Sequence, residues 1–253
     1  MMTYSEMERE LNEIPKFGAK ASLSNLSAYL ELANHPERNL RVIHIAGTNG
    51  KGSVSAYIDS ILRQAGYMTA LFTSPHLIKI NERFRINFKE CSDEELINVW
   101  CSVKDYMVKG EEKGLQSLTF FEILFFMGML IFSQKAVDYC ILETGLGGRL
   151  DATVLSNPVL SVITSISYDH TEILGDTIEK IAAEKAGIIK EGIPVVAMDE
   201  KNGAFSVIER TAKEKNAPVY GLKSQELTIL KKCENTIDFS INSRYYKISN
   251  LKV

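Results

Sequence analysis

Residues 41–53, RVIHIAGTNGKGS, constrain this chain more than any other segment. An apolar run that stops at a glycine-rich turn, followed by a helical pattern, predicts a strand, a tight loop and a helix. Glycines let several backbone N–H groups point at one anion, and the helix N-terminus and Lys51 add positive charge. We therefore expect the turn to bind the phosphates of a nucleoside triphosphate through Gly47, Thr48, Asn49, Gly50, Lys51, Gly52 and Ser53.

The turn departs from the common phosphate-loop string G-x-x-x-x-G-K-[ST], because Gly52 separates Lys51 from Ser53. This spacing points away from common kinases and GTPases. Ser53 has two interpretations: a residue of the phosphate site, or only the cap of the following helix.

Composition excludes several classes of protein. A length of 253 residues with 45% hydrophobic residues allows one large core or two modest ones. The net charge of −3 gives no basic field for nucleic acid or anionic lipid. The four cysteines lack paired spacing, which predicts neither disulfides nor a zinc site and fits the cytoplasm. The apolar segment 118–132 is short for a membrane span and contains Glu122, so we expect a buried helix.

Helical and strand patterns alternate along most of the chain. The expected helices are 4–12, 24–34, one ending near 64, 92–108, 118–132, 176–190 and 204–215, and the expected strands are 42–46, 69–72, 137–142, 159–163, 194–197 and 218–220. Alternation predicts a doubly wound, mostly parallel α/β sheet that helices cover on both faces. Residues 73–89 are expected to form a long polar loop.

Three domains or segments are expected. Residues 1–40 are a helical segment packed on the core, and 41–223 are the nucleotide-binding domain. After 224 the pattern changes to short half-polar strands at 227–230, 236–241 and 244–248, which predict a small antiparallel appendage.

A glutamate and a histidine follow two strands of the predicted sheet. Glu143 ends an apolar strand, and His170 lies beyond the strand at 159–163. Ligands in open α/β sheets bind at the carboxyl ends of strands, so both residues are candidates for Mg²⁺ ligands. The alternatives are a solvated carboxylate at 143 and a structural histidine at 170.

Six segments together carry a resemblance to a known family. They are GTNGKGS, TSPH, NERFRIN, LTFFE, ILETGLGGRLDAT and ITSISYDHTEILGDTIEKIAAEKAGIIK. Their order between about 17 and 196 resembles the folylpolyglutamate synthase / dihydrofolate synthase family of the Mur-ligase group. That resemblance implies ATP-dependent joining of a folate or dihydropteroate carboxylate to L-glutamate through an acyl phosphate, in folate biosynthesis and one-carbon metabolism.

The resemblance also implies roles for individual residues. Lys51, Lys185 and His170 would be catalytic. Two Mg²⁺ sites would use Ser74, Glu143, His170 and Lys185, the last carboxylated by CO₂. The substrate would lie near Thr119, Phe120, Phe121, Glu122, Leu150, Asp151 and Ala152. On its helical pattern alone, Lys185 would be an exposed lysine, although its small neighbours allow the burial that lowers a lysine pKa.

Three departures from the family pattern qualify this expectation. Val154 follows DAT where the family usually has Asn, and Asn87-Phe88 stands where Asn-Gly is usual. The family's G-x-H-Q-x-x-N-A segment and C-terminal ligase domain are expected to be absent. The alternatives are a nucleotide-binding fragment without ligase activity, another Mur-type amide ligase, or another phosphotransferase. The full-length form is expected to be a cytoplasmic monomer.

Overall fold

The computed structural model describes residues 2–16, 23–200, 202–234, 236–245 and 247–252. Within them the main sheet has eight strands, whose bounds are β1 Val42–Ala46, β2 Thr69–Phe72, β3 Phe84–Ile86, β4 Lys89–Glu90, β5 Tyr139–Glu143, β6 Pro158–Ile163, β7 Val195–Met198 and β8 Val219–Leu222. Their spatial order is β4-β3-β2-β5-β1-β6-β7-β8. All neighbouring pairs are parallel except β2–β3 and β3–β4. The expected mostly parallel α/β fold is confirmed.

Helices supply the covering layers. Their bounds are α1 Tyr4–Glu13, α2 Leu23–Leu32, α3 Lys51–Gln64, α4 Asp93–Glu112, α5 Phe120–Ser133, α6 Thr171–Leu174, α7 Ile178–Ala186 and α8 Ala204–Glu214, with short 3-10 turns η1 Pro36–Asn39, η2 Ile80–Arg83, η3 Ala152–Leu155 and η4 Ser224–Glu226. A threonine or serine N-cap paired with a glutamate three residues on starts α1, α4 and α5.

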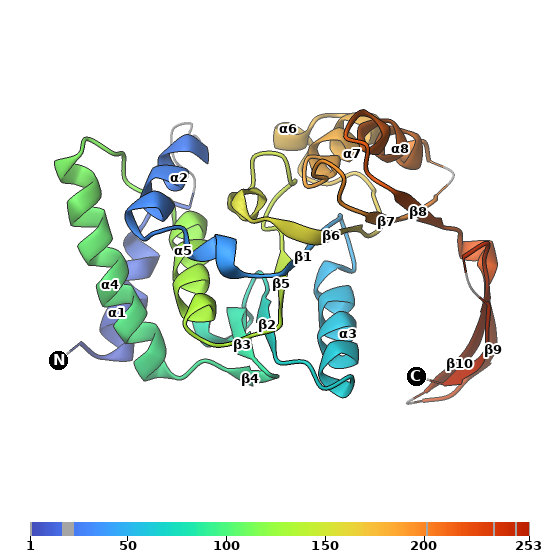
Figure 1. The fold of residues 1–253 in the computed structure, drawn as a ribbon, viewed down its shortest axis with the longest axis horizontal. Coiled ribbons are helices and arrows are strands. Elements are labelled where there is room, and N and C mark those ends of the chain that lie inside the picture. Colours follow the sequence, from blue (N-terminus) through green and yellow to red (C-terminus); the bar gives the residue numbers. More distant parts are fainter. Residues whose placement is uncertain (1, 17–22, 201, 235, 246, 253) are drawn as a thin grey trace.

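The direction of the strand connections reverses at β1, and this reversal determines which face of the sheet each helix covers. The chain moves one way from β1 to β2 through α3, and the other way from β6 to β7 through α7. Because such crossovers are right-handed, the two helices lie on opposite faces of the sheet. Figure 1 shows α3 on one side of β6 and β7, and α7 and α8 on the other. The carboxyl ends of β1 and β6 therefore form a topological switch point, where ligands of such sheets bind.

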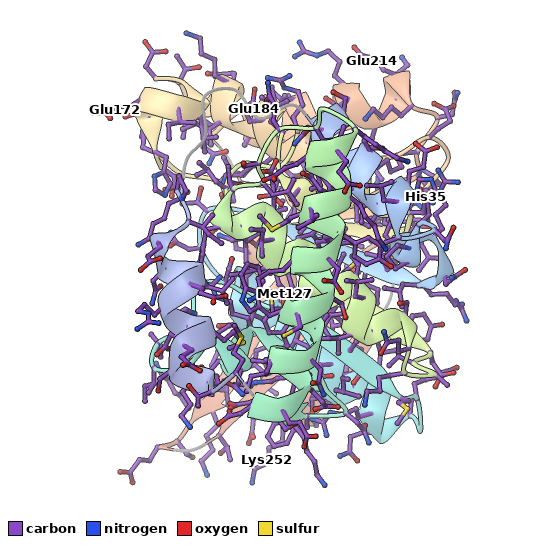
Figure 2. The ribbon with its side chains drawn as sticks, turned by 90° about the vertical axis from the view of Figure 1, so that its left-hand side faces the viewer. His35, Met127, Glu172, Glu184, Glu214 and Lys252 are labelled. Atoms are coloured by element: carbon purple, nitrogen blue, oxygen red, sulfur yellow. The ribbon has the colours of Figure 1, made fainter. Side chains whose placement is uncertain are left out.

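The core follows this division. Ile43 and Ile45 of β1 face α3, whereas Val42 and Ala46 face the other side. On that other side α1, α2, α4 and α5 share one apolar cluster, and α7 and α8 share a second. Met127 of α5 is fully buried and lies behind α4 in Figure 2. In the part of the chain that the structure describes, no helix combines the length and apolarity that a membrane crossing needs.

Some expected elements differ from the observed ones. The segment 73–89 is not wholly a loop, because η2 and the short strands β3 and β4 form the antiparallel edge of the sheet. The helix expected over 176–190 is shorter, and α7 ends at Ala186 with Gly187 as its C-cap. The last expected strand, 244–248, is displaced to β11.

The C-terminal appendage is antiparallel, as expected. Its strands are β9 Leu227–Lys232, β10 Ile237–Asn242 and β11 Lys247–Lys252, in the order β11-β10-β9. Figure 1 shows this small sheet extending away from the main body beyond β8.

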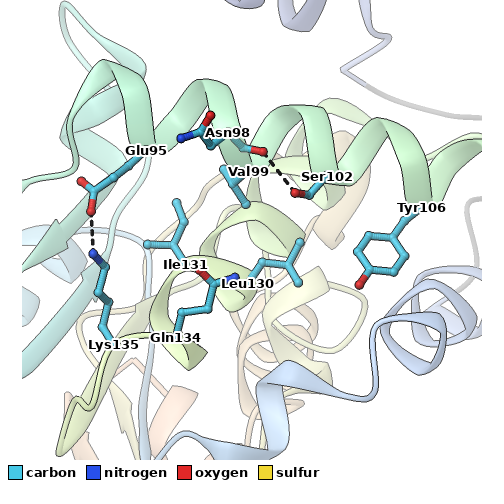
Figure 3. A pocket seen from close by; sticks show the side chains of 9 residues that line it. All are labelled: Glu95, Asn98, Val99, Ser102, Tyr106, Leu130, Ile131, Gln134 and Lys135. Atoms are coloured by element: carbon cyan, nitrogen blue, oxygen red, sulfur yellow. Dashed lines mark hydrogen bonds and ion pairs between the residues drawn. The ribbon is translucent and has the colours of Figure 1, made fainter.

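One groove lies at the end of α5 opposite the switch point. It has a volume of about 250 Å³ and runs between α4 and α5. Figure 3 shows its rim, where Glu95 and Lys135 form an ion pair at 2.7 Å. Leu130, Ile131 and Val99 form its apolar wall. The groove lies at the end of α5 away from Thr119–Glu122, so we do not assign it to the candidate site.

Candidate active site at the carboxyl ends of the strands

The glycine turn after β1 is packed against the end of β6. A Cβ atom on Gly47 would lie 1.8 Å from Thr164 Oγ1, so only glycine fits there. The Thr164 hydroxyl donates to the Asn49 carbonyl at 2.7 Å, and the Thr48 N–H donates to the Ser165 carbonyl at 2.8 Å. These contacts fix the predicted phosphate loop at the switch point between β1 and β6.

Helix α3 begins at Lys51, with Gly50 as its N-cap in the left-handed conformation at φ 82°. Gly50 has no side chain with which to cap the helix, so the N–H groups of the first turn face the loop. The alternative that Ser53 caps this helix is wrong, because Ser53 lies inside the first turn. Ser53 lines a hollow of about 400 Å³, together with Gly50, Gly52, Ser74 and Glu143.

Two lysines meet at the phosphate loop. Lys51 Nζ donates to the carbonyls of Gly47 at 3.0 Å and Thr48 at 3.2 Å. Lys185 Nζ donates to the same Gly47 carbonyl at 2.9 Å and lies 3.6 Å from Asp169 Oδ2. Lys185 is only 1% exposed. Burial lowers its pKa to about 8, the positive charge of Lys51 adds to this, and Asp169 opposes it.

Close packing of α7 on the GLGGR turn explains the burial of Lys185. An ideal Cβ on Gly187 would lie 2.4 Å from Arg149 Cα, and one on Gly148 would lie 2.9 Å from the carbonyl oxygens of Glu184 and Lys185. Arg149 also forms an ion pair with Glu184 at 2.8 Å. The exposed position that the helical pattern predicts for Lys185 is wrong.

Glu143 ends β5 and is 4% exposed. The Ser74 N–H donates to its Oε2 at 3.2 Å. Burial raises the pKa of this carboxyl, opposed by the Ser74 hydrogen bond and by the charges of Lys51 and Arg83. The alternative of a solvated strand-end carboxylate is wrong. A buried carboxylate at the phosphate loop suits a cation, because its charge needs a partner there.

His170 lies beyond β6 in the left-handed conformation, with a side chain that is 59% exposed. Its Nε2 is 3.4 Å from Asp169 Oδ1, and the other oxygen of Asp169 faces Lys185. Among the described residues, no three His, Cys, Asp or Glu side chains converge as a metal cage. Mg²⁺ at nucleotide sites commonly uses one or two carboxylates together with phosphate oxygens and water.

The two segments predicted to bind the substrate lie side by side. An ideal Cβ on Gly145 would lie 2.7 Å from the Phe121 ring, so the ring packs directly on the turn that leads to Leu150. Phe120 and Ala152 are buried, and Leu150 is 66% exposed. Substrate contact by these residues remains a prediction.

Both carboxylates of these segments are engaged within the chain. Glu122 Oε2 accepts from the Thr119 N–H and hydroxyl at 2.7 Å each, the N-terminal cap of α5. Asp151 Oδ2 accepts from the N–H groups of Gly145 and Leu146 at 2.9 Å each. The Glu122 bonds fix the start of α5, and the Asp151 bonds order the turn that follows Glu143.

Sequence reasoning missed two charged residues near this site, Arg83 and Glu82. Arg83 is 6% exposed, donates through Nε to His76 Nδ1 at 2.7 Å and lies 5.8 Å from the centre of the Phe120 ring. Burial lowers its pKa to about 10.

Glu82 accepts from the N–H groups of Leu77, Ile78 and Lys79, which lowers its pKa to about 2. The NERF string was the available signal for both, whereas Asp169, beside His170 in the DHT string, was only left without a role.

These observations define the class of protein. The Mur ligase middle domain family matches residues 45–251, and the chain belongs to that family. Its curated relatives include proteins named dihydrofolate synthase/folylpolyglutamate synthase and folylpolyglutamate synthase. The chain is 45% identical over 208 residues to the dihydrofolate synthase/folylpolyglutamate synthase of Bacillus subtilis, an alignment that covers 82% of this chain and 48% of that protein.

Solved structures give the same result. The apo form of L. casei FPGS superposes with a TM-score of 0.92 at 30% identity, covering 100% of this chain and 62% of that one. E. coli FolC in complex with DHPP and ADP gives a TM-score of 0.86 at 29% identity, covering 100% and 58%. The predicted resemblance is confirmed, and the chain spans about half the length of the curated relative.

Proposed function

We propose that this chain is the ATP-binding part of a ligase that joins L-glutamate to a folate or dihydropteroate carboxylate through an acyl phosphate. The observation that carries the proposal is the convergence of Lys51, Lys185 and Glu143 on the glycine turn at the switch point. The related E. coli protein that holds DHPP and ADP supports these ligands.

The residues of the turn have separate tasks in this proposal. The N–H groups at the start of α3 point at the phosphates. Lys51 donates to backbone carbonyls at 3.0 and 3.2 Å, and exchanging these for phosphate oxygens gives it a charged partner. The Thr164 hydroxyl keeps the turn in shape while Lys51 moves.

Glu143 and the Ser74 hydroxyl fit Mg²⁺, because they supply oxygen ligands beside the phosphate loop. When bound, Mg²⁺ would neutralise phosphate charge and so assist transfer to the carboxylate. His170 and Asp169 are the candidates for a second Mg²⁺ site, with Lys185 beside them.

Carboxylation of Lys185 forms part of the proposal. Its pKa of about 8 leaves a fraction of the amine neutral, which reaction with CO₂ requires. A carbamate would replace a cation with an anion next to Asp169 and the Gly47 carbonyl, so it needs a metal cation between them. Incubation with ¹³C-bicarbonate, Mg²⁺ and ADP should give a carbamate ¹³C resonance, which Lys185→Met should abolish. An unchanged spectrum in the wild-type chain would reject carboxylation.

The acceptor binds, in this proposal, where Phe121 packs on Gly145. The test is calorimetric titration of residues 1–253 with Mg-ATP, dihydropteroate and tetrahydrofolate. Binding of Mg-ATP and of one acceptor supports the proposal. Binding of Mg-ATP alone favours a nucleotide-binding module, and binding of neither rejects the proposal.

We expect residues 1–253 assayed by themselves to bind nucleotide without completing ligation. Ligation needs the glutamate amine held close to the activated carbon, and the proposal assigns no described residue of this chain to a glutamate site. Glutamate-dependent ADP release by the purified polypeptide would contradict this. The 1–40, 41–223 and 224–253 division, a monomeric full-length form and a cytoplasmic location remain proposals, and named relatives include mitochondrial ones.

A further inference from the structure

We propose that His44 is a positioning residue for the turn that follows Glu143. It acts through Thr153 and Asp151, which tie the turn down by backbone hydrogen bonds. The proposal rests on the proposed function only in assigning this turn to the acceptor substrate.

The chain of hydrogen bonds is continuous. His44 Nε2 lies 2.8 Å from Thr153 Oγ1, and that hydroxyl donates to Asp151 Oδ1 at 2.5 Å. The Thr153 N–H donates to the same oxygen at 3.0 Å. Asp151 Oδ2 accepts from the N–H groups of Gly145 and Leu146 at 2.9 Å each. The two oxygens of Asp151 thus accept four hydrogen bonds, all from this chain.

The direction of these bonds fixes the form of the imidazole. A threonine hydroxyl has one proton, and Thr153 gives it to Asp151, so His44 must donate to Thr153 from Nε2–H. An imidazolium would also donate from Nε2, but complete burial lowers the pKa of His44 to about 3, so the ring is neutral with its proton on Nε2.

The other ring nitrogen of His44 lowers the stability of the fold. Nδ1 of His44 is buried and has no hydrogen-bond partner among the described residues. An unpaired buried acceptor destabilises a protein, and the neighbouring strand positions, Ile43 and Ile45, are apolar. An aliphatic residue at 44 would remove the unpaired atom, and it would also remove the donor to Thr153. We attribute the presence of a histidine at this position to the donor that it supplies to Thr153.

The turn that Asp151 holds connects Glu143, beside the phosphate loop, with the expected acceptor segment. Gly145 lies two residues after Glu143 and packs against Phe121. Leu150 and Ala152 flank Asp151 in the expected acceptor segment. A shift of the Gly145 backbone would therefore move the Phe121 ring, whereas the glycine turn of residues 47–53 is fixed separately by Thr164.

Two matched pairs of variants test the inference in residues 1–253. Thr153→Val removes the hydroxyl at nearly constant shape, and Thr153→Ser retains it. His44→Leu removes the donor, and His44→Gln places an amide N–H near the position of Nε2. The readouts are amide hydrogen exchange at Gly145 and Leu146 and the dissociation constants for dihydropteroate and Mg-ATP.

We expect Thr153→Val and His44→Leu to speed exchange at Gly145 and Leu146 about tenfold, with exchange at Ile141 in β5 unchanged. Dihydropteroate affinity should fall about five- to tenfold, with Mg-ATP affinity within about twofold. Thr153→Ser and His44→Gln should restore both values. Unchanged exchange in Thr153→Val would overturn the inference, even if His44→Leu fails to fold. Equal losses of affinity for dihydropteroate and Mg-ATP that Thr153→Ser and His44→Gln do not restore would also overturn it. If the wild-type chain binds neither ligand, the proposed function fails while the exchange data still decide this inference.

Discussion

Lys51 and Lys185 donate to one acceptor, the carbonyl oxygen of Gly47, at 3.0 and 2.9 Å. Two cations on one carbonyl repel each other, and the charge of Lys51 contributes to the lowered pKa of Lys185. An anion arriving at the glycine turn would relieve this repulsion. The arrangement therefore favours phosphate binding before any ligand contact is considered.

Lys51→Met should weaken Mg-ATP binding by about 100-fold, because a preorganised charge at the phosphates is lost. Calorimetric titration measures this. Lys180→Met is the matched control, since it removes the same charge from an exposed ion pair on α7. Equal affinities for Lys51→Met and the wild-type chain would contradict the phosphate-loop assignment.

Lys185 should give the chain a defined pH dependence of stability. Below about pH 8 the folded and unfolded states both carry the ammonium group, and the folded state bears the cost of burying it. Between about pH 8 and 10.5 the folded state loses the proton first, so the free energy of unfolding rises with pH. The lowering of the pKa from 10.5 to about 8 corresponds to a rise of about 3 kcal/mol.

Denaturant unfolding of the wild-type chain and Lys185→Met across this range measures the effect. The difference in the free energy of unfolding between the wild-type chain and Lys185→Met should change by about 3 kcal/mol across this range, because all other groups titrate in both proteins. Asp169→Asn removes the negative charge that raises this pKa, and so should move the rise to lower pH. A constant difference between wild type and Lys185→Met would show that the lysine keeps its ordinary pKa.

Local patterns were sufficient to predict much of the fold and part of the site. The apolar run at 42–46 and the glycine turn predicted β1 and the phosphate loop, and the helical pattern over 92–108 predicted the start of α4. The position of Glu143 at a strand end predicted its place beside the loop, because carboxyl ends of parallel strands share one edge of the sheet.

Properties that depend on distant packing could not be predicted in this way. The burial of Lys185 depends on two separate segments approaching closely, with Gly148 against the Glu184 and Lys185 carbonyls and Gly187 against Arg149. His44 lies within an apolar run, and only the structure shows its bond to Thr153, 109 positions away. The edge strands β3 and β4 have three and two residues, too few for a periodic pattern.

Glu143→Gln should separate function from stability. Burial raises the pKa of Glu143, so the ionised form costs free energy, and the neutral amide should leave the chain as stable as wild type or about 1 kcal/mol more stable at pH 7. Mg-ATP affinity should fall, while the affinity for ATP without Mg²⁺ should not. Glu95→Gln, on a surface ion pair with Lys135, is the control. Loss of stability with unchanged Mg²⁺ dependence would make Glu143 a structural residue.

Gly52→Ala should stabilise the fold and impair the site. Gly52 lies in the first turn of α3, where alanine is favoured over glycine by about 0.5–1 kcal/mol. An ideal Cβ there would lie 3.7 and 3.9 Å from the two Glu143 carboxylate oxygens, which is ordinary contact, so folding meets no clash. The methyl group would nevertheless occupy the space between the glycine turn and Glu143, where we propose Mg²⁺ and phosphate bind.

We therefore expect a higher midpoint of thermal unfolding together with Mg-ATP affinity about tenfold weaker, since the lost contacts are charge-assisted. Ser60→Ala, two turns further along α3, raises helix propensity without entering the hollow and should keep nucleotide affinity unchanged. Gly52→Ala with both higher stability and normal Mg-ATP affinity would show that this space is not the nucleotide site. Nucleotide would then have to bind the N-terminus of α3 without approaching Glu143, and the proposed role of that carboxylate would fail with it.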